Sequence, residues 1–193
     1  MSPLTIASYA HRILGHIPWE HWVVMVVVAL AWTVILLIWK KYSVYGAVAW
    51  GLTVFMALFL LDTAVGIRYL GLMKHTAGHN LTLDFSRMFQ KTGLGQAESL
   101  CNVAVFVPFG LFLSEFLASA KRLRPGRRLG LATLAGFGLS LCIESLQLVL
   151  KVGFFELTDL VMNMVGAFVG ALISVGVRKV AGRKSRVIGE GHV

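Results

Sequence analysis

Two acids and two amides lie within one of the most apolar parts of this 193-residue chain. Glu144 and Gln147 are three residues apart, so both lie on one face of a helix. Asp159 and Asn163 are four residues apart and share a face in the same way. Paired carboxylates can act as general acid and base, whereas amides favour hydrogen bonding to a polar ligand. An ionisable side chain at membrane depth costs about 2.5–3.5 kcal/mol, so we expect a site or a partner to compensate.

The composition predicts that these residues do lie at membrane depth. The chain is 57% hydrophobic and 14% charged, and its mean hydropathy is +0.77. A soluble domain is about 25% charged. The formal net charge of +9 comes mostly from short runs beside apolar segments, which indicates membrane topology rather than nucleic-acid binding. We therefore expect an integral membrane protein of one compact domain, with membrane lipids as partners and no nucleic acid.

Apolar runs predict an all-α bundle of about five transmembrane helices. Each run is about long enough to cross a bilayer; they cover residues 22–39, 45–61 (continuing towards 68), 100–118, 129–150 and 159–177. Pro108 lies inside the third run and is expected to kink it. The chain accordingly divides into an interfacial segment (1–21), a transmembrane domain (22–177) and a basic tail (178–193).

Basic residues predict the orientation of the bundle. Lys40 and Lys41, the run 121–128 and the tail 178–186 all fall on one side when the spans are odd in number. Cytoplasmic loops are rich in Lys and Arg, so we expect the N-terminus outside and the C-terminus in the cytoplasm. The loop 71–99 is then external, with a short interfacial or re-entrant segment.

This topology brings the polar residues of three spans to a similar depth. Asn102 lies near the outer end of the third span, at about the level of Glu144 on the fourth and Asp159 on the fifth. The sequence therefore predicts an outward-facing polar pocket. A structural alternative stays open, in which Glu144 pairs with Lys151 or accepts a hydrogen bond from Gln147 to hold helices together.

Small residues on the fifth span predict close helix packing. Gly166 and Gly170 form a G-x-x-x-G pattern that Ser174 extends. Asn163 lies one turn before this pattern, so we expect it to face another helix. Glu115, near the inner end of the third span, is expected to pair beside the basic loop.

The sequence predicts no metal and no cofactor. His75 and His79 are four residues apart with Asp84 nearby, but Gly78 disfavours the helix that would align them. Cys101 and Cys142 lie in apolar runs and are expected to act as small apolar residues.

An ordered set of motifs resembles the VanZ-like family over about residues 50–175. The motifs are Asn102-Val-Ala-Val-Phe-Val-Pro-Phe-Gly110, Glu144-x-x-Gln147 and Asp159-x-x-x-Asn163-x-x-Gly166. One departure is that the family pattern carries an arginine about six residues after the glutamine. This chain has Gly153 there, Glu156 supplies the acid that follows, and Lys151 is a candidate for the positive charge.

The resemblance implies a multi-pass protein of the bacterial cytoplasmic membrane, associated with resistance to glycopeptide antibiotics such as teicoplanin. In a first hypothesis, the pocket binds an envelope lipid, a lipid-linked cell-wall precursor or a lipoglycopeptide. In a second, Glu144 and Asp159 are the catalytic acid and base of an enzyme acting on a lipid-linked envelope substrate. In a third, the protein is a structural adaptor. Substrate-binding roles fall to Asn102, Gln147, Asn163, Lys151 and Glu156.

Overall fold

Five long helices dominate the computed structural model, which describes residues 11, 13–39, 42–72, 81–82, 93–120 and 122–190. The elements are α2 (Trp19–Ile38), α3 (Val44–Leu61), the π-helical segment η1 (Asp62–Gly66), α4 (Ile67–Tyr69), β1 (Leu81–Thr82), α6 (Gly93–Ala120), α7 (Pro125–Val149), β2 (Phe155–Glu156) and α8 (Leu157–Glu190). The two short strands pair in parallel, Leu81 with Phe155 and Thr82 with Glu156.

Five helices in the described part of the chain are long and apolar enough to cross a membrane. They cover Trp19–Ile38, Val44–Tyr69, Ser99–Ala120, Pro125–Val149 and Leu157–Ala181. The predicted all-α class with about five spans is thus confirmed. The helix α6 continues through Pro108. Most of the predicted interfacial segments, in 1–21 and 71–99, and the His75–His79 pair lie outside the described residues.

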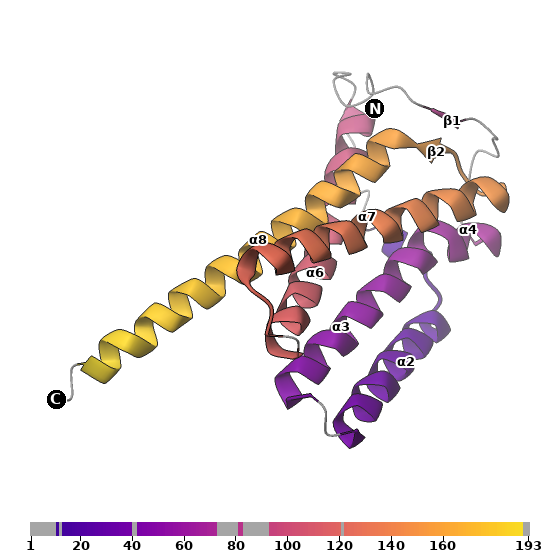
Figure 1. Ribbon diagram of the computed structural model, residues 1–193. Coiled ribbons are helices and arrows are strands. Elements are labelled where there is room, and N and C mark those ends of the chain that lie inside the picture. The colour runs from indigo at the N-terminus through magenta and orange to yellow at the C-terminus, as the bar shows by residue number, and fades with distance from the viewer. Residues whose placement is uncertain are drawn as a thin grey trace.

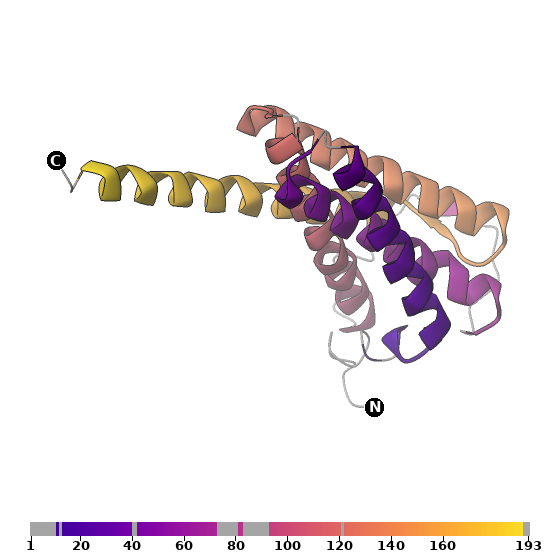
Figure 2. The same ribbon diagram turned by 90° about the horizontal axis from the view of Figure 1, so that it is seen from below.

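The helix α8 packs against both α6 and α7, and its contact with α6 is the most extensive one between two described elements. Figure 1 and Figure 2 show its C-terminal half projecting past the other helices. A side chain at Gly166 would collide with Phe106 of α6, its Cβ 2.8 Å from that residue's Cβ. At Gly170 a Cβ would lie 2.7 Å from the backbone nitrogen of Leu111. These contacts confirm the predicted close packing and show that α6 and α8 run in the same direction.

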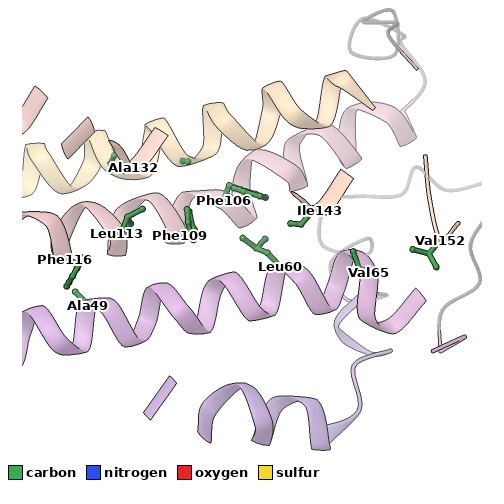
Figure 3. Packing of buried hydrophobic residues seen from close by; sticks show 12 residues of the cluster. Ala49, Leu60, Val65, Phe106, Phe109, Leu113, Phe116, Ala132, Ile143 and Val152 are labelled. Atoms are coloured by element: carbon green, nitrogen blue, oxygen red, sulfur yellow. The ribbon is translucent and has the colours of Figure 1, made fainter. Parts of the chain in front are cut away.

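The apolar core lies between α3, α6, α7 and α8. Phe106 of α6, only 2% exposed, lies with Leu60 of α3 and Ile143 of α7 in one buried cluster (Figure 3). The cluster extends to Val65 and Val152 at one end of the bundle, called here the β2 end. This core fixes α7 beside η1 and the start of α8, where the predicted site residues lie.

Candidate functional site

The last turns of α7 place two polar side chains inside the β2 end. Glu144 is 2% exposed and Gln147 is 7% exposed. An Oε2 atom of Glu144 accepts a hydrogen bond from the backbone N–H of Glu156 at 2.9 Å. The partner that the structure shows is therefore the strand β2, whereas the sequence suggested Lys151 or Gln147. This bond ties the end of α7 to the segment that starts α8.

Gln147 bonds across the bundle to the π-helical segment. Its Nε2 donates to the backbone carbonyl of Ala64 at 3.0 Å. A π-helix is rare, occurs often at functional sites and displaces the regular backbone hydrogen bonds of an α-helix. The side chain of Gln147 supplies a hydrogen-bond donor to the Ala64 carbonyl of η1, and this bond holds η1 against α7.

Asn163 of α8 faces α7, as the sequence predicts. Its Nδ2 donates to Oγ of Ser140 at 2.9 Å, and the residue is 5% exposed. Its Oδ1 is buried and has no hydrogen-bond partner among the described residues. Since α7 and α8 run in opposite directions, this bond places Glu144 and Asp159 together, one turn nearer the β2 end.

Gly153 has no side chain, and the Arg68 guanidinium lies close to its backbone. A Cβ built at Gly153 would lie 3.3 Å from Nη1 of Arg68 and 3.3 Å from Cβ of Gln147. Lys151 is exposed, with φ of +60°. The cation beside Gly153 is therefore the half-buried Arg68 of α4, which sequence reasoning missed.

The Glu144 carboxyl lies within electrostatic range of the Asp159 and Glu156 carboxylates and of Arg68. Asp159 and Glu156 are half-buried and therefore accessible, in contrast to Glu144. We call Arg68, Glu144, Gln147, Glu156 and Asp159 the polar cluster. It joins donors and acceptors in one place, as recognition of a sugar or peptide head group requires.

The structure shows no hydrogen bond or ion pair between Asn102 and this cluster among the described residues. Asn102 is half-buried on α6, near the contact that Gly166 makes with Val103. No group of three His, Cys, Asp or Glu side chains that could hold a metal ion occurs within the described residues.

A second polar network lies at the opposite end of the bundle and is centred on Glu115. Its carboxylate accepts hydrogen bonds from Tyr45 at 2.7 Å and from Ser174 at 2.6 Å. Arg178 of α8 donates to it from Nε at 2.8 Å and bonds Ser119 through Nη2. The sequence predicted that Glu115 pairs beside the basic loop. In the described structure its ion pair is with Arg178, at the start of the basic tail.

Comparison with known proteins identifies a family. The family model VanZ/LLP1 matches residues 23–178, which is most of the chain and includes the polar cluster. No curated protein and no solved structure shows significant similarity to this chain.

Proposed function

Because the chain belongs to the VanZ/LLP1 family, we propose that it is a VanZ-type protein of the bacterial cytoplasmic membrane that binds an amphiphilic component of the cell envelope. The ligand's polar head contacts the polar cluster, and its apolar part stays in the lipid. The observation that carries this proposal is the Arg68 guanidinium beside Gly153, within electrostatic range of the Glu144 carboxyl group.

The distribution of charge supports an outward-facing cluster. The basic residues 122–128 and Arg178 lie at the end of the bundle opposite to β2. The positive-inside rule assigns this basic end to the cytoplasm. The polar cluster then faces the outer leaflet, where cell-wall precursors and extracellular antibiotics are found.

The burial of Glu144 favours binding over catalysis. A general acid or base must come within hydrogen-bonding reach of the substrate atom from which it takes a proton or to which it gives one. Glu144 is 2% exposed, and one carboxylate oxygen already accepts the Glu156 N–H. This arrangement organises the backbone of the site, while Arg68, Glu156 and Asp159 remain accessible to a ligand.

The chemistry of the cluster fits a head group that contains sugar and peptide. A guanidinium binds carboxylate or phosphate through paired hydrogen bonds, and carboxylates accept from hydroxyl and ammonium groups. Both a lipid-linked cell-wall precursor and a lipoglycopeptide such as teicoplanin carry these groups on an apolar chain. Binding of the second class would connect the protein to glycopeptide resistance.

The proposal is tested by titrating purified protein in detergent with teicoplanin and, separately, with a polyprenyl-diphosphate-linked muropeptide. We expect saturable binding of at least one ligand. Arg68→Gln and Asp159→Asn each remove a charged hydrogen-bond partner, so each should weaken binding about tenfold or more. Glu20→Gln, an exposed acid on α2, is the matched control.

Two results would overturn the proposal. One is the absence of saturable binding of either ligand to folded protein at micromolar concentration. The other is turnover of a ligand by the wild type that Asp159→Asn abolishes, since that would make the protein an enzyme.

A further inference from the structure

A groove beside η1, lined by residues of α2, α3 and η1 and by Leu146 of α7, contains none of the residues of the polar cluster. It has a volume of about 550 Å³ and lies between α2 and the end of α3. Of the ten described residues that line it, eight have no polar side chain: Val24, Met25, Val28, Leu58, Leu61, Val65, Gly66 and Leu146. The other two are His21 and Asp62, which gives an apolar groove one polar pair.

The polar pair is built by two helices that are distant in sequence. Nδ1 of His21 lies 2.8 Å from Oδ1 of Asp62. A carboxylate only accepts hydrogen bonds, so Nδ1 carries the proton and Nε2 is the nitrogen left for another partner. Nε2 makes no hydrogen bond to any described residue, and Oδ2 of Asp62 is likewise without a partner in that part of the chain.

Gly66 allows the carboxylate to take this position. A Cβ built at Gly66 would collide with Oδ1 of Asp62 and lie 3.2 Å from its Cγ. Both residues belong to η1. The π-helical turn places the Asp62 carboxylate next to Gly66 and directs it towards α2. The local structure thus directs the acid to His21.

The dimensions of the groove match a lipid chain with its head at the membrane boundary. His21 lies in the first turn of α2, next to Trp19, a residue type enriched at membrane interfaces. Val28 lies seven residues further along the helix, so the groove extends about 10 Å from the polar pair towards the middle of the membrane. The part of an acyl chain nearest the head group fits this apolar length.

The charge of the lining selects the head group. Among the described residues the lining includes one carboxylate and neither lysine nor arginine, so it attracts a cationic group. Oδ2 of Asp62 is buried, so Nε2 of His21 is the acceptor that a hydrogen-bond donor in the groove can reach. We propose that this groove binds a phospholipid with an ethanolamine head group, whose ammonium donates to the His21–Asp62 pair while one acyl chain lies along α2 and α3.

The experiment measures which phospholipid stays bound to the protein. Wild-type protein is reconstituted into vesicles of phosphatidylcholine with equal amounts of phosphatidylethanolamine and phosphatidylglycerol, re-extracted, and examined by native mass spectrometry. We expect phosphatidylethanolamine to be retained in preference. Phosphatidylcholine has the same charge but no N–H donor, so it is the matched lipid control.

Two variants test the groove. Asp62→Asn removes the charge at constant shape and should lower ethanolamine-lipid retention about tenfold. Val28→Trp fills the apolar part and should have a similar effect without touching the polar pair. Glu20→Gln, one residue before His21 and exposed, should retain lipid as the wild type does.

Each remaining outcome overturns the inference. Equal retention of phosphatidylcholine excludes recognition of the donor, and equal retention of phosphatidylglycerol excludes selection of the ammonium. Unchanged retention in a folded Asp62→Asn variant excludes the polar pair as the anchor. Arg68→Gln should leave this retention intact, so the groove and the polar cluster are tested separately.

Discussion

The contact between α6 and α8 makes a quantitative prediction about Gly170. In Gly170→Ala, the added Cβ would lie 2.7 Å from the backbone nitrogen of Leu111 and 2.9 Å from the carbonyl carbon of Val107. Real contacts of a Cβ essentially never fall below 3.0 Å, and both atoms are backbone. The two helices must therefore move apart along the most extensive helix–helix contact in the described structure.

Overpacking of this kind costs about 1–3 kcal/mol. For a chain of about 190 residues, 1 kcal/mol corresponds to roughly 2–4 °C in Tm. Gly170→Ala should thus lower Tm by about 2–12 °C. Thermal unfolding of purified protein in a mild detergent, followed by loss of the monodisperse peak in size-exclusion chromatography, measures this shift.

Gly176 on the same helix provides the control. Nothing lies within 4 Å of a Cβ built there, and alanine is favoured over glycine in a helix by up to about 1 kcal/mol. Gly176→Ala should keep or raise Tm. If Gly170→Ala were as stable as Gly176→Ala, the close approach of α8 to α6 would be refuted.

Two further substitutions test the polar contacts. Tyr45→Phe removes one donor to Glu115 and should cost about 1 kcal/mol. Glu115→Ala removes the acceptor of Tyr45, Ser174 and Arg178 together and should cost about 2–3 kcal/mol. Equal Tm values for the two variants would contradict the network. Gln147→Leu leaves the Ala64 carbonyl without its side-chain donor and should cost about 1–3 kcal/mol of stability. The loss should appear as faster amide hydrogen exchange in η1. Unchanged exchange in η1 would show that this hydrogen bond does not hold the segment.

Patterns within single helices predicted much of the structure. The five apolar runs indicated the five long helices, because length and hydropathy alone decide which segments suit a bilayer. Helical spacing also placed Gly166 and Gly170 on the face that meets α6. Asn163 was predicted to face a neighbouring helix for the same reason, and it bonds Ser140 of α7.

Contacts between distant helices could not be predicted in this way. His21 and Asp62 are 41 residues apart, and neither carries a local signal of the other. Arg68 was read as the end of a span, because only the fold shows that it approaches Gly153. Glu115 was assigned to the nearest basic run, yet it pairs with Arg178, which is 63 residues away.

The length of α8 carries its C-terminal end well beyond the rest of the bundle. The helix is held from Asn163 to Arg178 by hydrogen bonds to α7 and α6 and by the close contacts at Gly166 and Gly170. Glu190 lies 12 residues after Arg178, so about 18 Å of the same helix continues past these contacts. A change in the axis direction of α8 would therefore move its C-terminal end farther than any residue held within the bundle.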